Sequence, residues 1–256
     1  MRKIGFILLF LPIFALAQTE QSQDEKQLYN MSFDEWSKRR GAWFPQPEDA
    51  KGREKDWDSA NKGLSFIGLN GTTPEYEHVA VKGDGKAACR IKSRNFLGIF
   101  VAGNLYNGAF IKIAGMSGAV LSFGVPFSHR PKSLSGYYHY KPGIVDLARK
   151  PREYMRGRTD EAKIDILLTD WKTPFVIDTR YGKFVDGESD PSVIGYGLKV
   201  LTTDYGDYVH FEIPIDYRSD TTPSYICIVA ASSRFGDAYT GSSDSILYID
   251  ELQLNY

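Results

Sequence analysis

The hydrophobic pattern of this chain is that of short β-strands separated by turns. Residues 163–169 and 209–215 alternate apolar with polar side chains, and residues 225–231 form an apolar run, as expected for a strand covered on both faces. Glycine-containing turns separate further apolar segments, at 64–69, 78–82, 86–93, 99–102, 110–114, 119–123 and 246–254. Helix is predicted only at 32–40 and 193–198. About a dozen short strands predict an all-β fold, a jelly-roll β-sandwich of two antiparallel sheets with little helix.

The densest group of candidate binding side chains lies between residues 122 and 143. The strand expected there places Tyr137 and His139 on one face and Tyr138 and Tyr140 on the other. We expect Tyr138 to be buried, because it shares its face with an apolar leucine. Tyr137 and His139 are then either presented to a sugar, which needs flat rings beside polar groups, or part of a wide aromatic core.

Arg130, Asp165 and Trp171 complete the candidate ligand site. Arg130 offers fixed donors suited to a diol or a uronate, or it holds its proline-framed loop through a salt bridge. Asp165 stands in an otherwise apolar strand, and Arg130 is its candidate partner. Trp171, at the exit of that strand, is either a stacking platform or a core residue.

The catalytic signal is weak. Glycoside hydrolysis needs two carboxyl groups about 5–9 Å apart, and closely spaced acidic pairs on one strand are absent here. Asp165 with Glu212 is a possible pair across strands. Glu212 and Asp216 share a face, but Pro214 between them indicates an edge strand. No Ser-His-Asp, Cys-His or phosphate-loop pattern is present.

Metal and cysteine chemistry is sparse. If the first and last strands are neighbours, Asp58 and Asp250 approach each other as oxygen ligands for a structural Ca²⁺; the alternative is ordinary capping of strand ends. No other cofactor is expected. Cys89 and Cys227 form a disulfide or, as we favour, remain separate buried thiols.

The first 17 residues have the pattern of a secretory signal peptide. Arg2 and Lys3 precede an apolar run that ends in Ala15-Leu16-Ala17, so cleavage is expected before Gln18 and the protein is expected to be exported, periplasmic or secreted. The run is too short to span a bilayer, and no later segment is long and apolar enough. Removing Arg2 and Lys3 takes the net charge from −1 to −3, and without a basic stripe nucleic acid is not an expected partner.

Several segments together resemble the "putative carbohydrate metabolism domain" family of exported bacterial proteins. The segments are 57–61 (WDSAN), 102–108 (AGNLYNG), Arg130-Pro131, 136–143 (GYYHYKPG), Asp165-Ile166 and 247–252 (LYIDEL). The resemblance covers about residues 41–256. It implies a jelly roll similar to carbohydrate-binding modules and a role in glycan use at the cell envelope. Relatives often carry a further immunoglobulin-like domain and a lipid-anchor cysteine, for which this chain has no counterpart.

The sequence therefore predicts three segments: a signal peptide at 1–17, a partly disordered lead-in at 18–40, and one jelly-roll domain at 41–256. The leading hypothesis is a non-catalytic protein that binds an oligosaccharide or polysaccharide through Arg130, Tyr137, His139, Asp165 and Trp171. The alternative is a glycoside hydrolase or lyase that uses Asp165 with another carboxylate. A third reading is a structural or adhesion protein of the envelope.

Overall fold

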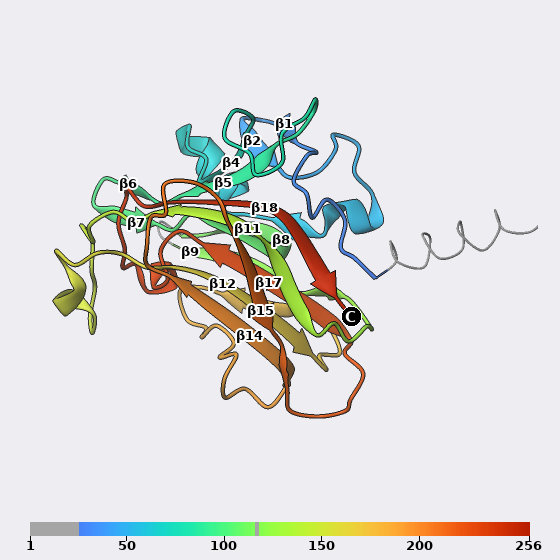
Figure 1. Cartoon of the computed structure of the whole chain (residues 1–256). Coiled ribbons are helices and arrows are strands. Elements are labelled where there is room, and N and C mark those ends of the chain that lie inside the picture. Colours follow the sequence, from blue (N-terminus) through green and yellow to red (C-terminus); the bar gives the residue numbers. More distant parts are fainter. Residues whose placement is uncertain (1–25, 116–117) are drawn as a thin grey trace, which may run out of the picture.

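The computed structural model describes residues 26–115 and 118–256, so the predicted signal peptide lies outside the described residues. The chain forms two stacked antiparallel sheets, which confirms the all-β jelly-roll prediction (Figure 1). Its few helical segments are short: α2 (Asn61–Leu64), η1 (Gly52–Lys55), η2 (Ser65–Ile67), η3 (Glu153–Met155) and η4 (Gly236–Ala238).

The larger sheet has nine strands. Its main order is β13 (Phe175–Asp178), β9 (Gly118–Phe123), β8 (Asn104–Ala114), β17 (Tyr225–Ala231), β12 (Ala162–Thr169), β14 (Val193–Leu201) and β16 (Asp216–Tyr217). Two short strands lie beside this path: β3 (Trp57–Asp58) pairs with β8, and β10 (Val125–Pro126) pairs with β17.

The smaller sheet has five strands, in the order β15 (Val209–Pro214), β11 (Ser133–Lys141), β18 (Ile246–Asn255), β5 (Ala88–Lys92) and β4 (Thr72–Glu75). The edge position of β15 agrees with the expectation from Pro214, because proline cannot donate to a neighbouring strand. Two small hairpins stand apart from both sheets, β1 (Ser37–Arg39) with β2 (Ala42–Phe44), and β6 (Arg94–Phe96) with β7 (Ile99–Val101).

The main core fills the space between the sheets. It combines one face of β8, β12 and β17 with residues of β5, β11, β15 and β18, as the alternating patterns predict. Leu28, Met31 and Phe33 also belong to this core, so part of the predicted lead-in packs on the sandwich. The domain boundary at residue 41 stays a prediction.

A second apolar cluster covers the opposite face of the nine-stranded sheet. It includes Phe123 of β9 together with Tyr106, Leu167 and Cys227, and these last three alternate along their strands with residues of the main core. The sheet is therefore apolar on both faces, and its outer face is available for a site.

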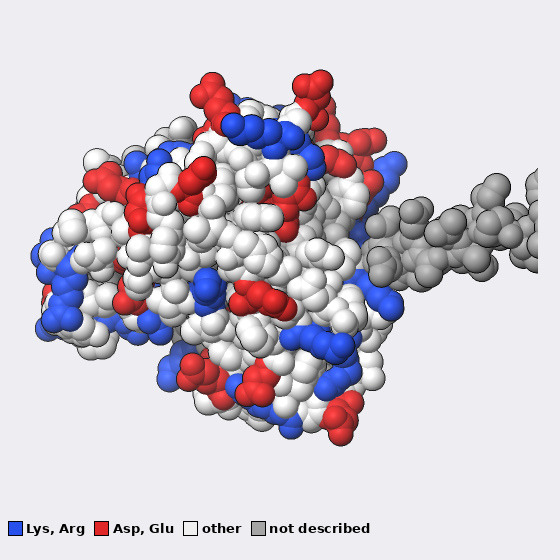
Figure 2. Space-filling view, viewed as in Figure 1, with Lys and Arg blue, Asp and Glu red and all other residues white. Residues whose placement is uncertain are grey.

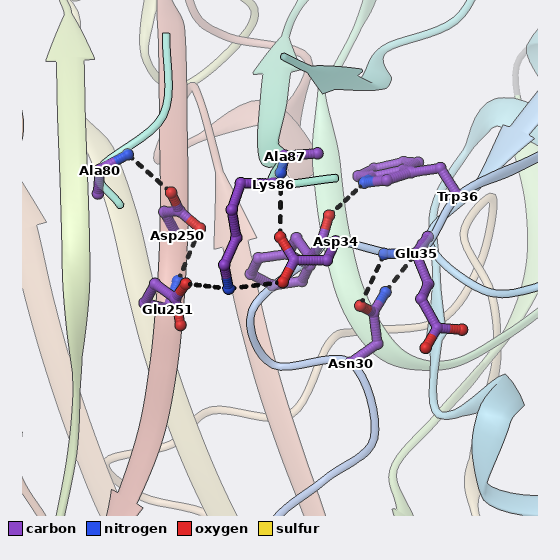
Figure 3. Close-up of polar contacts among 10 residues, drawn as sticks. Asn30, Asp34, Glu35, Trp36, Ala80, Lys86, Ala87, Asp250 and Glu251 are labelled. Atoms are coloured by element: carbon purple, nitrogen blue, oxygen red, sulfur yellow. Dashed lines mark hydrogen bonds and ion pairs between the residues drawn. The ribbon is translucent and has the colours of Figure 1, made fainter. Parts of the chain in front are cut away.

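Both predicted helices are wrong. Residues 193–198 belong to β14. Atoms of neighbouring segments lie so close to Gly195 and Gly197 that a larger side chain would not fit at either position. In the 32–40 segment, Phe33 has φ +56, which an α-helix does not allow, and Asn30 bonds both backbone groups of Glu35 (Figure 3).

Two predicted strands are also absent. Residues 64–69 begin in helical turns, because the Asn61 side chain bonds the backbone of Trp43, Gly71 and Thr72 and so fixes a compact turn. Residues 78–82 form no strand. Cys89 and Cys227 are buried free thiols, one in each sheet.

Candidate functional site

A cleft of about 680 Å³ lies on the outer face of the nine-stranded sheet. Its floor comes from β8, β9, β12 and β17. Its walls come from residues 60–67, from the β6–β7 hairpin at 96–102, and from the segments that follow β12 and β17. Most of the lining is apolar, and its large aromatic members are Phe66, Phe96, Phe100, Tyr106, Phe110, Phe123, Trp171, Phe175, Phe184 and Tyr239. A concave apolar surface with few polar groups is typical of a small-molecule site.

Two polar side chains stand on one line across the cleft floor. Val229 of β17 is opposite Tyr106 of β8 on one side and opposite Asp165 of β12 on the other. Since neighbouring strands are about 4.8 Å apart, the Cα atoms of Tyr106 and Asp165 are separated by roughly 10 Å. Both residues are buried, and the Tyr106 hydroxyl and Asp165 Oδ1 have no hydrogen-bond partner among the residues that the structure describes.

The Tyr106 hydroxyl stays protonated, and so can donate a hydrogen bond, throughout the physiological range. Burial, and secondarily the Asp58 carboxylate, raise the pKa of Tyr106 well above its usual value. Asp165 presents the complementary acceptor, because Lys163 Nζ lies 2.8 Å from Oδ2 and leaves Oδ1 unbonded. An unpaired buried polar atom costs stability, so two of them in one cleft indicate a place for a polar ligand.

Trp171 forms part of the cleft wall. Its ring stacks on Phe175 with 5.6 Å between centroids, and its Nε1 donates to Ser192 Oγ at 2.8 Å. Gly124 makes this packing possible: it has φ +88, and a Cβ there would lie 2.8 Å from the Trp171 ring. Trp171 is thus both a wall of the cleft and a fixed aromatic surface.

The structure brings Asp165 and Trp171 together at the cleft but places Arg130 elsewhere. The Arg130 guanidinium donates to the backbone oxygens of Ser219 (2.9 Å) and Thr221, and it lies 4.0 Å from the Tyr217 ring centroid. The predicted Arg130–Asp165 pair is wrong, since Lys163 is the partner of Asp165. Arg130 holds a loop.

Tyr137 lines a separate groove of about 560 Å³ on the outer face of the five-stranded sheet. Its ring meets His210 edge-on at 5.3 Å, and Glu251 and Gln253 also line the groove. Glu251 is held by Lys86, whose ammonium group lies 3.0 Å from Glu251 and 2.8 Å from Asp34 (Figure 3).

His139 is buried with an exposed fraction of 1%, which agrees with the alternative of an aromatic core and not with presentation beside Tyr137. Its Nδ1 lies 2.6 Å from Nε2 of His78, and its Nε2 lies 3.0 Å from Asp204 Oδ1. Tyr208 and Tyr248 surround the two imidazoles. Both ring nitrogens of His139 are therefore used inside the protein. Tyr138 and Tyr140 are buried in the core, as predicted for Tyr138.

Asp58 and Asp250 lie in different sheets, on β3 and β18, so the prediction that their strands are neighbours is wrong. Each carboxylate accepts two backbone N–H groups, Asp58 from Ser59 and Phe110, and Asp250 from Ala80 and Glu251. Burial raises the pKa of each to about 6. Within the described residues no group of three or more His, Cys, Asp or Glu side chains could hold a metal ion. A calcium role stays a prediction that this arrangement does not favour.

Sequence reasoning missed Tyr106 and Lys163. Residues 102–108 enter the sequence analysis only as part of the family resemblance, and Lys163 has no role in it. Lys163 and Asp165 are two residues apart in one strand, so they lie on the same face of it. This spacing is the signal in the sequence from which their ion pair could be predicted.

Comparison with known proteins identifies the domain. The model of the "putative carbohydrate metabolism domain" matches residues 32–255. No curated protein sequence matches the chain. In the described residues no helix is long and apolar enough to cross a membrane.

Two solved structures share the fold. A putative glycoside hydrolase from Bacteroides thetaiotaomicron VPI-5482 is 20% identical with a TM-score of 0.67, over 88% of this chain and 70% of that one. A second, from Bacteroides vulgatus ATCC 8482, is 21% identical with a TM-score of 0.59, over 78% and 85%. The non-crystalline cellulose-specific module CBM28 is more distant, at 11% identity and a TM-score of 0.36, over 82% and 90%.

Proposed function

Because the chain belongs to the putative carbohydrate metabolism domain family, we propose that it binds a saccharide in the cleft on the outer face of the nine-stranded sheet. The observation that carries the proposal is the pair of unpartnered groups on the cleft floor, the Tyr106 hydroxyl and Asp165 Oδ1. Sugar hydroxyls both donate and accept, so one sugar chain can satisfy the two groups.

The walls complement these polar groups. Sugar rings carry apolar C–H faces, and Trp171 with Phe175 gives them a fixed flat surface. The Lys163 ammonium holds the Asp165 carboxylate in place. The site is built from strands and a packed ring, so it needs little reorganisation to bind.

Affinity gel electrophoresis with soluble polysaccharides tests the proposal. The panel contains xyloglucan, arabinoxylan, galactomannan, mixed-linkage glucan, pectic galactan, polygalacturonate, alginate, hyaluronan and chondroitin sulfate. At least one of them retards the wild type, and Asp165→Asn and Trp171→Ala reduce the retardation. Tyr137→Ala, which alters the other groove, retains it. No retardation by any polysaccharide, or loss with Tyr137→Ala alone, contradicts the proposal.

Hydrolysis of the bound saccharide is a second candidate function. It is favoured by one feature of the cleft: Asp165 and Asp237 both line it, and both carboxylates interact electrostatically with the Lys163 ammonium. Two carboxyl groups across a sugar are the requirement for glycosidases. Reducing-sugar release that is lost in both Asp165→Asn and Asp237→Asn supports this candidate, and binding without release excludes it.

Export is a further part of the proposal, resting on the signal-peptide pattern of residues 1–17. Expression in a bacterial host followed by N-terminal sequencing of the extracytoplasmic protein is expected to give Gln18 as the first residue. Retention of Met1 in a cytoplasmic product contradicts it.

A further inference from the structure

A strongly basic segment lies outside the cleft described above. Residues 149–158 contain Arg149, Lys150, Arg152, Arg156 and Arg158 with the single acid Glu153, in a chain whose net charge is −1. All of the five basic residues except Arg152, which is half-buried, are exposed. Figure 2 shows Lys and Arg gathered at the left edge of the molecule, where Figure 1 draws the segment around η3.

The segment is held against the chain that follows β17. Leu147 and Gly241 form a β-bridge, and the Arg149 backbone N–H donates to Thr240 Oγ1 at 3.1 Å. The Arg149 guanidinium lies 5.0 Å from the Tyr239 ring centroid, and that of Arg152 lies 4.8 Å from the Phe235 centroid. These contacts fix both guanidinium groups on aromatic faces.

The same aromatic segment borders the cleft. Tyr239 lines the cleft, as does Arg234, whose guanidinium lies 5.1 Å from the Phe235 centroid and so shares that ring with Arg152. The basic segment thus stands at one end of the cleft rather than on a remote surface.

The arginines of the segment have no acidic partner among the residues that the structure describes. Arg234 is paired with Glu161 at 2.9 Å, but no described carboxylate lies within 4.0 Å of the five basic groups of residues 149–158. Nearby, Arg156 donates to the backbone oxygen of Asp146, whose carboxylate is bonded by Ser243. Guanidinium groups held on rings with unused donors fit a planar or tetrahedral oxyanion.

We propose that the saccharide bound in the cleft is acidic, and that Arg149 and Arg152 bind its carboxylate or sulfate group at the cleft end. This inference rests on the proposed function. The uncharged part of the sugar chain lies over the apolar walls and the Tyr106–Asp165 floor, and the anionic group extends to the arginines. Uronates and sulfate esters share this chemistry.

The test compares matched ligands and matched charge changes. Polygalacturonate and its methyl ester share one sugar backbone, and the ester lacks the negative charge. Hyaluronan and chondroitin sulfate separate uronate from sulfate recognition. Arg149→Gln/Arg152→Gln removes two positive charges at the cleft end. Lys55→Gln/Lys82→Gln removes two exposed charges from residues that line neither groove.

The wild type is expected to bind at least one acidic polysaccharide more tightly than every neutral one, with affinity that falls as salt rises. The arginine double variant is expected to lose roughly tenfold in affinity, the effect of losing one or two charge-assisted hydrogen bonds. The lysine double variant keeps wild-type affinity. Equal binding of acidic and neutral polysaccharides, or an unaffected arginine variant, overturns the proposal.

Two other outcomes separate this inference from the proposed function. Binding of neutral polysaccharides that requires Asp165 but not the arginines retains the cleft function and refutes the acidic ligand. Binding that requires the arginines but ignores Asp165→Asn and Trp171→Ala contradicts the cleft function. Tighter arginine-dependent binding of a single-stranded oligonucleotide than of any saccharide marks a nucleic-acid surface and refutes the inference.

Discussion

Tyr106 and Asp165 both face Val229, from opposite sides of strand β17. This register places two unpartnered polar groups on the two sides of Val229, in a cleft floor that is largely apolar. A fold selected for stability alone would replace or pair them, because each buried unpaired group costs free energy. Their presence is therefore the main structural reason to place a polar ligand in this cleft.

Tyr106→Phe separates binding from stability. Removing the unpaired hydroxyl is expected to raise the free energy of unfolding by about 1 kcal/mol, since the ring remains and the desolvated oxygen is lost. Affinity for the saccharide is expected to fall. Urea unfolding and affinity electrophoresis measure the two effects. A variant that is less stable, or that binds as well as the wild type, contradicts the role of this hydroxyl.

Lys163→Met tests the ion pair beneath the cleft. It leaves the buried Asp165 carboxylate without its cation, which is expected to lower the free energy of unfolding by about 2 kcal/mol, less than for a fully buried pair because Lys163 is partly exposed. Adding Asp165→Leu is expected to restore stability without restoring binding. Lys55→Met, at an exposed site, serves as the control. A double variant no more stable than Lys163→Met would refute this account of the pair.

Gly124→Ala tests the support of Trp171. The substitution combines an unfavourable φ of +88 with a Cβ placed 2.8 Å from the ring, so it is expected to destabilise the fold by about 2 kcal/mol or more and to weaken saccharide binding. Gly85→Ala is the matched control, with φ +74 and nothing within 4 Å of the new Cβ. Thermal unfolding of both variants measures the difference. Equal losses would show that the Trp171 contact is unimportant.

The half-buried His78, which contacts the buried His139, predicts a loss of stability in acid. Burial, and then the neighbouring His139, lower the pKa of His78 below its usual 6.5. The unfolded chain then takes up the proton first, so the contribution of His78 is complete above pH 6.5 and is lost as the pH falls below that value. His78→Gln removes this titration.

Urea unfolding at pH 7.5 and 5.5 measures the effect. The wild type is expected to lose more stability than His78→Gln between these values. Asp58 and Asp250 have raised pKa values, which make the folded state more stable as the pH falls. Both residues are present in the wild type and in the variant, so their contribution cancels in the comparison. Identical pH dependence of the two proteins would contradict the prediction.

The fold class could be predicted from the sequence because alternation reports which face of a strand is buried. The prediction of individual elements failed where a single side chain determines the backbone conformation. Asn61 fixes a helical turn at α2, and Asn30 fixes the turn before β1. Neither interaction has a periodic signature.

The candidate site could be predicted only in part. Asp165 and Trp171 line the cleft. The alternation of side chains along a strand could not show that loops cover His139 or that Arg130 donates to backbone oxygens. Odd and even positions in a strand identify the face on which a side chain lies. Only the packing of segments distant in the sequence decides whether that face is accessible to a ligand. Tyr106 was missed because its importance depends on strand pairing across β17.

Calorimetric titration of one oligosaccharide into three proteins tests the central claim most directly. The oligosaccharide is prepared from the polysaccharide that retards the wild type most, and the proteins are the wild type, Asp165→Asn and Tyr137→Ala. The account predicts that Asp165→Asn weakens binding by about tenfold, the effect of one hydrogen bond to a charged group, while Tyr137→Ala leaves it unchanged. Unchanged affinity for Asp165→Asn together with weaker binding by Tyr137→Ala would move the site to the five-stranded sheet and contradict the account.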